Sequence, residues 1–334
     1  MTRNTVYAPW YSDEYKVPGS GNSDVRDYLT LTPQDIKREL EQNVVNQDEA
    51  CRKIAILMYQ HLQGHRFVGM LAGPTGSGKS FIAENLKAAF PDLVYIRDVS
   101  NLTCDGWSGV NKVSTLFKGV RYSYDTAGGP YPLMFLDECD KMFSVKMNAG
   151  VENVSESVQY ELLTVIHGGE IETKTITERG PVFNKIDTSN MSFLFAGAFE
   201  KKAKDIAVKE SGASIGFGAS HARLSTYNRE LTMDDVREAG CITELCGRIQ
   251  KLICLNKIGE EDFVNMLNFT DRGPVNELQN EFGITINISK SKKEEIAHNA
   301  YVSGLGIRGI KNTIREYIDE LMWEDCHAMI LEIA

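Results

Sequence analysis

The chain has 334 residues, of which 42% are hydrophobic and 25% charged, values that are ordinary for a soluble globular protein large enough for two domains. No apolar run approaches the roughly 18 residues that a membrane-spanning helix needs. The first residues, MTRNTVYAPWYSDEYK, contain no apolar signal core. We therefore expect a cytoplasmic protein with no membrane partner.

Charge bears on the kind of partner, and cysteine content bears on the compartment and on structural zinc. The formal net charge is −10, and no block of like charge stands out. A protein that follows nucleic-acid phosphates usually carries a basic stripe, so nucleic acid is not expected as the main partner. The seven cysteines include no pair with C-x-x-C spacing. We expect reduced thiols in a reducing compartment and no structural zinc.

The first elements in chain order are an extension and two helices. Residues 1–30 show little periodicity and are expected to form a loosely ordered N-terminal extension. A helix is predicted in LTPQDIKREL, because Thr32 suits the N-cap, Pro33 suits the first helical position and Asp35 lies three residues after the cap. A second helix is predicted in QDEACRKIAILMYQHL.

Buried strands are predicted next. Short apolar runs separated by helical stretches indicate a parallel sheet with helices on both faces, and these runs are FVGMLA, LVYIR, LMFLD and MSFLFAG. The segment GGEIETKTITERGPVFNKID alternates polar and apolar residues and predicts a hairpin. After about residue 250 the pattern becomes mainly helical, with one short strand expected at ITINIS. The predicted fold class is α/β, with a large domain at 31–254 and a small helical domain at 255–334.

The octapeptide GPTGSGKS matches the phosphate-binding pattern G-x-x-x-x-G-K-[ST] in full. Glycines let the backbone bend so that N–H groups converge on phosphates, and the N-terminus of the following helix attracts the same anions. Lys79 is expected to reach the β- and γ-phosphates, and the Ser80 hydroxyl to ligate Mg²⁺. The predicted nucleotide-binding residues of this loop are Gly73, Pro74, Thr75, Gly76, Ser77, Gly78, Lys79 and Ser80.

The run LMFLDECDK supplies two carboxylates at the end of a predicted buried strand. Asp137 is expected to hold the Mg²⁺ shell, and Glu138 to orient and polarise the attacking water. Together with the glycine loop, these residues predict a Mg²⁺–nucleotide site. The two motifs alone do not separate a small-molecule kinase from a motor protein.

From about Leu31 to Glu324, the motifs and their order resemble those of ClpX, a family of AAA+ ring unfoldases. The resemblance implies an AAA+ large domain of the P-loop NTPase type followed by a small helical lid domain. It also implies that NVVNQDEA wraps the adenine of ATP, with Val44 and Val45 on the base and Gln47 in the following helix.

The same resemblance implies two pore loops. The family grips polypeptide with a Gly-Tyr-Val-Gly loop, which corresponds here to the segment GWSG; an aromatic ring contacts many kinds of side chain without needing matched hydrogen bonds. In the second loop, within TERGPVFNKIDTSN, only Arg179 matches the basic character of the family. The expected substrate-gripping residues are Gly106, Trp107, Ser108 and Gly109.

Two arginines match catalytic positions of the family. Arg248, in ELCGRIQKLICLN, corresponds to an arginine finger that reaches the γ-phosphate held by the neighbouring subunit. Arg308, in GLGIRGIKNTI, corresponds to the lid arginine that reaches the phosphates of its own subunit. The strand MSFLFAGAFE occupies the sensor-1 position but has no Asn or Thr at its end, so that role stays unassigned.

A tripeptide within SGASIGFGAS matches the family's docking element for the ClpP peptidase, and its residues are Ile215, Gly216 and Phe217. Apolar anchors on six loops of a ring would add avidity. The family's usual N-terminal zinc-binding domain is expected to be absent, with about 30 residues in its place, so adaptor use is not carried over.

The expected function is that of an ATP-dependent, homohexameric unfoldase and translocase that uses ATP and Mg²⁺, threads polypeptide through a central pore and passes it to a ClpP-type peptidase. Three alternatives remain. The ring could act as a remodelling chaperone without a peptidase, the same ATPase core could drive a nucleic-acid motor, or the chain could be a P-loop kinase. A kinase has no use for Arg248 acting between subunits.

Overall fold

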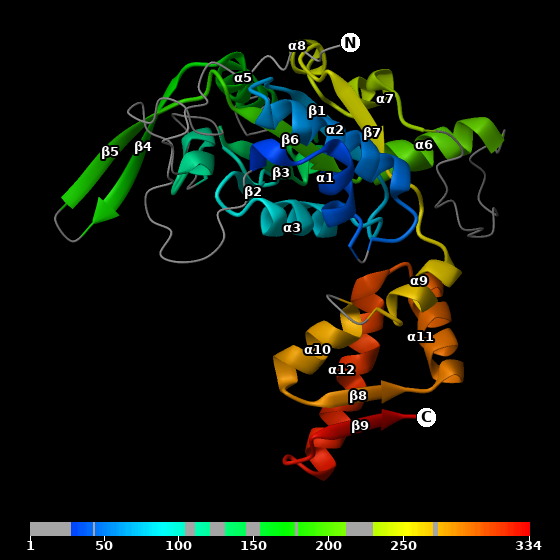
Figure 1. The fold of residues 1–334 in the computed structure, drawn as a ribbon. Coiled ribbons are helices and arrows are strands. Elements are labelled where there is room, and N and C mark those ends of the chain that lie inside the picture. The colour runs from blue at the N-terminus through cyan, green and yellow to red at the C-terminus, as the bar shows by residue number, and fades with distance from the viewer. Residues whose placement is uncertain are drawn as a thin grey trace, which may run out of the picture.

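The computed structural model places two bodies of unequal size, joined by the chain that follows strand β7 (Figure 1). The residues that it describes are 28–42, 44–103, 111–120, 131–144, 154–177, 180–211, 230–269 and 273–334. No helix in these ranges combines the length and the apolar character needed to cross a membrane.

A five-stranded parallel sheet forms the centre of the larger body. Its strand order is β2-β3-β6-β1-β7. Parallel neighbours cannot be joined by tight turns, so crossover segments that contain the helices connect the strands. The residues of β1, β6 and most of β3 are buried, which explains why these strands are continuous apolar runs. The strands are β1 (Val68–Ala72), β2 (Val94–Asp98), β3 (Leu133–Asp137), β6 (Ser192–Gly197) and β7 (Lys251–Cys254).

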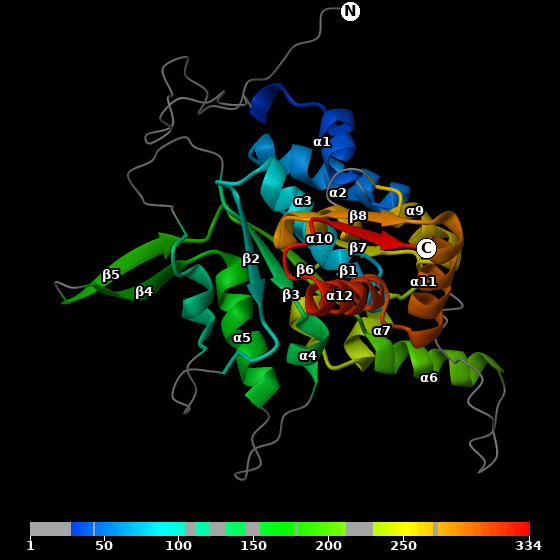
Figure 2. The ribbon, with the colours of Figure 1, turned by 90° about the horizontal axis from the view of Figure 1, so that it is seen from below.

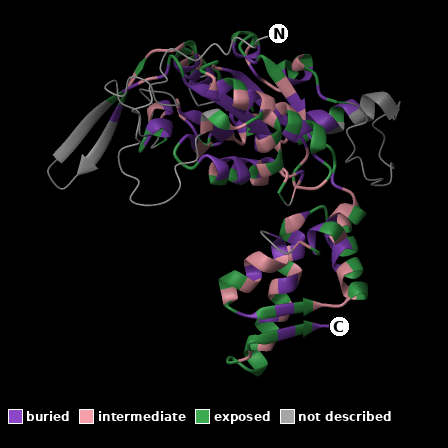
Figure 3. Cartoon of the chain, in the orientation of Figure 1, coloured by how far each residue is buried: buried purple, intermediate pink, exposed green. Residues whose placement is uncertain are grey.

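Helices cover both faces of this sheet, and each face has its own apolar core. The buried residues, purple in Figure 3, are concentrated inside the larger body. One core contains the apolar faces of α1 (Pro33–Leu40), α2 (Asp48–Leu62) and α3 (Lys79–Ala89). The other core contains residues of five helices and of the short 3₁₀ helix η2 (Val113–Phe117). These five are α4 (Cys139–Phe143), α5 (Val154–His167), α6 (Glu200–Ser211), α7 (Met233–Glu238) and α8 (Thr243–Cys246).

Two further elements belong to the larger body but lie outside its central sheet. A 3₁₀ turn, η1 (Tyr28–Thr30), precedes α1. The antiparallel hairpin of β4 (Glu170–Thr177) and β5 (Gly180–Asp187) projects away from the rest of this body in both views (Figures 1 and 2). The hairpin was expected from the alternation of residues 168–187, and its pairing confirms that prediction.

The described residues of the smaller body form four helices and a two-stranded parallel sheet of β8 and β9. Its apolar core is separate from the two cores that cover the large sheet. The mainly helical character and the strand at ITINIS agree with the prediction, whereas β9 was not predicted. The elements are α9 (Glu260–Met266), α10 (Pro274–Phe282), β8 (Thr285–Ile288), α11 (Lys290–Ser303), α12 (Ile307–Glu324) and β9 (Ile330–Ile333).

The fold class is therefore the predicted one, an α/β large domain followed by a small, mainly helical domain. We propose that the domains divide after Cys254, where β7 ends. Strand β7 was not predicted, because it has only four residues and lies at the edge of the sheet. The predicted cap of α1 is present: the Asp35 amide donates to Thr32 Oγ1 at 3.2 Å, and the Thr32 amide donates to Asp35 Oδ2 at 3.1 Å.

Candidate nucleotide site

The loop between β1 and α3 carries the glycine-rich motif. Gly76 and Gly78 have φ angles of 79° and 96°, values that favour glycine because a Cβ would be strained there. A Cβ on Gly73 would lie only 2.8 Å from Leu255 Cβ. The first turn of α3 follows directly, and its amides have no partner within the helix. The loop thus has the form of an anion cradle at a helix N-terminus.

Lys79 is buried at the start of α3. Its ammonium donates to the carbonyl oxygens of Gly73 at 2.7 Å and Pro74 at 3.0 Å. Burial lowers the pKa of Lys79, while the charge of Asp137 opposes that change. The Ser77 hydroxyl is also buried, and among the described residues it has no hydrogen-bond partner. The loop therefore holds a cation and an unpaired hydroxyl, which suits a phosphate-bearing ligand.

The two predicted acids lie at the end of β3. Ser80 Oγ donates to Asp137 Oδ2 at 2.9 Å, so the two residues expected to ligate Mg²⁺ are already in contact. Glu138 adopts the left-handed backbone region with a φ of 60°. Its carboxylate accepts from Lys141 Nζ at 2.7 Å. A hydroxyl beside a carboxylate is an oxygen donor set of the kind that Mg²⁺ binds.

Strand β6 ends between β3 and β1, next to these acids. The Ala198 amide donates to Asp140 Oδ1 at 3.0 Å and so ties the end of β6 to α4. Sequence reasoning missed this role of Asp140. A hollow of about 410 Å³ opens beside the glycine loop, and it is lined by Thr75, Asp140, Lys141, Ala198, Glu200 and Lys201.

The predicted adenine-binding valines lie where the two domains meet. Val44 packs against the large-domain core that contains α1, α2 and α3, whereas Val45 packs against the core of the small domain. Gln47 is the N-cap residue of α2, one position earlier than the helix proper, and it is buried. The segment therefore contacts both domains, as a base-binding segment at a domain junction would.

The small domain approaches the glycine loop through the start of α12. A Cβ on Gly306 would lie 3.4 Å from Gly76 Cα, so the two backbones pass close together. Arg308 is the second residue of α12 and is exposed. The predicted lid arginine thus lies near the phosphate-binding loop of its own chain.

Arg248 lies away from the glycine loop of its own chain. It comes just before β7, and β7 pairs with β1 in parallel register with Lys251 opposite Gly69. Arg248 is therefore near the beginning of the strands, whereas the glycine loop follows their ends. Five strand residues at about 3.3 Å each place the two roughly 17 Å apart along β1. The exposed guanidinium contacts the His167 ring at the end of α5.

Three groups of predicted residues lie outside the described ranges. They are the pore segment of Gly106, Trp107, Ser108 and Gly109, the second-loop Arg179, and the docking tripeptide of Ile215, Gly216 and Phe217.

Comparisons with known proteins agree with this architecture. A family model described as the AAA domain (Cdc48 subfamily) matches residues 66–252. The "ATP-dependent Clp protease ATP-binding subunit ClpX" of Treponema denticola is 27% identical over 364 residues, covering 95% of this chain and 88% of the relative. The ClpX subunits of Borrelia duttonii and Borrelia recurrentis are 25% identical over 318 residues, covering 88% of this chain and 74% of each relative. The chain belongs to the AAA domain family (Cdc48 subfamily) and is a ClpX-like, nucleotide-binding ATPase.

Proposed function

We propose that this ATPase is a protein unfoldase and translocase that works as a homohexameric ring and delivers polypeptide to a ClpP-type peptidase. The observation that carries the proposal is the position of Arg248. It is exposed at the beginning of the parallel strands, whereas the chain's own glycine loop follows their ends. An arginine finger placed there has to serve the nucleotide of another copy.

The geometry of the site supports the following assignment of nucleotide roles. Val44 and Val45 bind the adenine, and the loop from Gly73 to Gly78 holds the phosphates. Lys79 leaves the carbonyls of Gly73 and Pro74 to bind phosphate, which offers its ammonium a stronger, charge-assisted partner. Mg²⁺ held by Ser80 and Asp137 would neutralise charge on the phosphate oxygens.

Catalysis is assigned to three residues. Glu138 polarises the attacking water, and its contact with Lys141 fixes the carboxylate beside the hollow at the glycine loop. Arg248 of a neighbouring copy stabilises charge that develops in the transition state, an effect worth about 10³–10⁵ in rate in related enzymes. Arg308 acts from the lid of the same chain.

Mechanical work is assigned to the lid and to the pore segment. ATP bound at the domain junction changes the angle of the lid, and Trp107 drags the substrate chain through the pore. Target domains are stable by only about 5–15 kcal/mol, so repeated pulls on one end can unfold them.

The test of shared catalysis mixes two inactive variants, Arg248→Ala and Glu138→Gln. In a mixed ring, some sites combine an intact Glu138 with an intact Arg248 from the neighbour. The mixture should therefore hydrolyse ATP faster than either variant alone. A mixture no more active than its parts would overturn the assignment of Arg248.

Delivery to a peptidase is tested separately. A ClpP-type peptidase should co-purify with the full chain. It should no longer co-purify when Ile215, Gly216 and Phe217 are deleted. If ATP-driven unfolding persists and no peptidase binds the full chain, the protein acts as a remodelling chaperone instead.

A further inference from the structure

Gln47 has no assigned role in the nucleotide chemistry, yet the residue is only 2% exposed, and its side-chain amide both donates and accepts hydrogen bonds. Its amide nitrogen donates to the Ser77 carbonyl at 3.2 Å and to the Asn256 carbonyl at 2.8 Å. Its amide oxygen accepts from the Asn256 backbone N–H at 2.9 Å. One side chain thus joins the glycine loop to the chain that links β7 to the lid.

The neighbouring Asn46 extends this connection into the lid itself. The Asn256 side-chain amide donates to the Asn46 carbonyl at 2.7 Å. In turn, the Asn46 side-chain amide lies 3.3 Å from the Lys257 carbonyl and 3.3 Å from Asp262 Oδ2 on α9. The segment 46–47 therefore contacts the glycine loop, the linker and the first lid helix.

Because Gln47 is buried, breaking its hydrogen bonds costs free energy. A buried amide that loses its partner leaves polar atoms unsatisfied, so the cost of separating them is high. A shift of the Ser77 carbonyl relative to the linker breaks one of the two bonds that the Gln47 nitrogen makes. The positions of the loop and of the linker are therefore linked through this one side chain.

We infer that Gln47 is a positioning residue that couples the conformation of the glycine loop to the linker and the lid. When phosphate binding rearranges the loop around Ser77, Gln47 moves the Asn256 segment with it. This inference rests on the proposed function only in taking the loop as the ATP site. It does not require a ring, a substrate or a peptidase.

The test is hydrogen exchange measured by mass spectrometry on the full chain, with and without Mg²⁺ and a non-hydrolysable ATP analogue. Gln47→Glu keeps the side-chain shape but replaces the two donated bonds by repulsion between oxygens. Gln47→Met removes all three bonds without adding charge. Gln60→Glu, an exposed change on the same helix α2, is the matched control.

In the wild type and in Gln60→Glu, the analogue should slow exchange in two places, the glycine loop and the segment 255–310. In both Gln47 variants the loop should remain protected by the analogue. The nucleotide-dependent protection of 255–310 should fall about tenfold, the size of effect seen when a coupling residue is removed.

Two results would overturn the inference. In the first, segment 255–310 still follows the loop in both Gln47 variants. In the second, the variants lose protection of loop and lid together, which would make Gln47 a support for binding rather than for coupling. A wild type in which the analogue protects neither segment would refute the nucleotide site itself, a failure that the loop signal separates from the others.

Discussion

At the scale of single residues, the proposed ATP site depends on a few charged side chains at or after the ends of β1 and β3. Glu138 is held by an ion pair with Lys141, and Asp137 accepts from Ser80. The two acids are adjacent in sequence but face different partners. This separation supports the proposal that one carboxylate serves the metal ion while the other serves the water.

Glu138→Gln should bind ATP with near-normal affinity and hydrolyse it about 10²–10⁴-fold more slowly, because the amide cannot accept the proton of the attacking water. Steady-state ATPase assays and equilibrium nucleotide binding measure the two effects. Glu156→Gln, an exposed change on α5, serves as the control. Near-normal turnover by Glu138→Gln would refute its assignment.

His61 gives a pH prediction for stability. Its Nε2 donates to the Tyr131 carbonyl at 2.7 Å, and its Nδ1 accepts from Ser192 Oγ at 2.8 Å, so the buried ring is neutral. Burial lowers the pKa of His61 to about 4, whereas the unfolded chain has a value near 6.5. The unfolded state therefore takes up the proton first as the pH falls.

The His61 contribution to stability is complete above about pH 6.5 and is lost as the pH falls towards 4, with a total of at most about 3 kcal/mol. Urea unfolding between about pH 7 and 5 should show a steeper loss for the wild type than for His61→Gln. Equal slopes for the two proteins would contradict the prediction.

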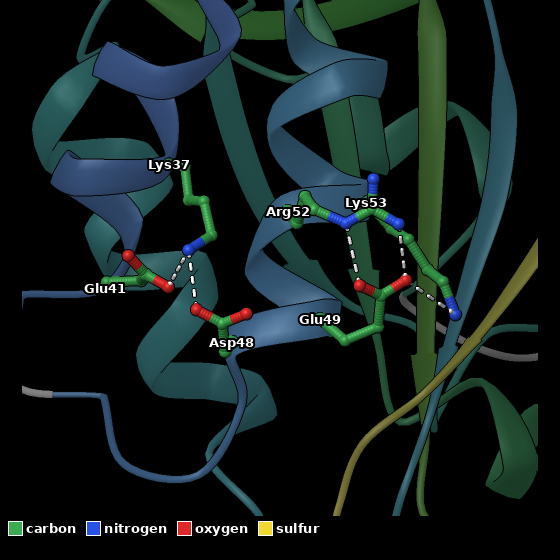
Figure 4. Close-up of polar contacts among 6 residues, drawn as sticks. All are labelled: Lys37, Glu41, Asp48, Glu49, Arg52 and Lys53. Atoms are coloured by element: carbon green, nitrogen blue, oxygen red, sulfur yellow. Dashed lines mark hydrogen bonds and ion pairs between the residues drawn. The ribbon is translucent and has the colours of Figure 1, made fainter.

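At the scale of elements, the loop between α1 and α2 is held at both of its ends. Lys37 on α1 binds Glu41 at 2.6 Å and Asp48, the first residue of α2, also at 2.6 Å (Figure 4). Its hydrogen bond with Asp48 is the main reason why the pKa of Lys37 is raised. The loop closed in this way carries Val44 and Val45.

Lys37→Met should weaken ATP binding about two- to fivefold, because the loop loses its closure while the exposed ion pairs themselves contribute little. Arg52→Met is the control, since Arg52 pairs with Glu49 within α2 and leaves the loop untouched (Figure 4). Isothermal titration with an ATP analogue measures the affinity of each variant. An equal effect of the two changes would show that the closure of the loop is irrelevant to binding.

The sequence predicted the elements whose signals are local. The cap of α1 and the buried strands β1 and β3 each depend on residues close together in the chain. Strand β9 could not be recognised, because four residues pair only with β8, more than forty positions earlier. The glycine loop was likewise readable as one octapeptide. The role of Gln47 was not, since its partners lie 30 and 209 residues away in sequence.

At the scale of the whole molecule, the lid and the large domain meet at two glycines. Gly306 has a φ of 60° and a ψ of −139°, a backbone conformation open almost only to glycine, and it lies against Gly76. The start of α12 can therefore approach the phosphate loop closely. This contact places Arg308, two residues after Gly306, near the glycine loop of its own chain.

Gly306→Ala should weaken nucleotide binding about tenfold, because backbone strain and the new Cβ move the lid away from the loop. Gly304→Ala is the control: Gly304 also has a positive φ, of 70°, but a Cβ there would meet nothing within 4 Å. Both changes should lower the melting temperature. Similar nucleotide affinities for the two variants would contradict the proposed contact.

In the proposed function, adjoining copies of the chain complete each ATP site, since Arg248 lies at the opposite end of the strands from its own glycine loop. The most direct measurement is the specific ATPase activity against protein concentration, with the particle mass recorded in the same samples at saturating Mg²⁺–ATP. We predict that activity appears only as the mass rises from 37.3 kDa towards six times that value. Full activity in a particle that stays at the mass of one chain would contradict the account.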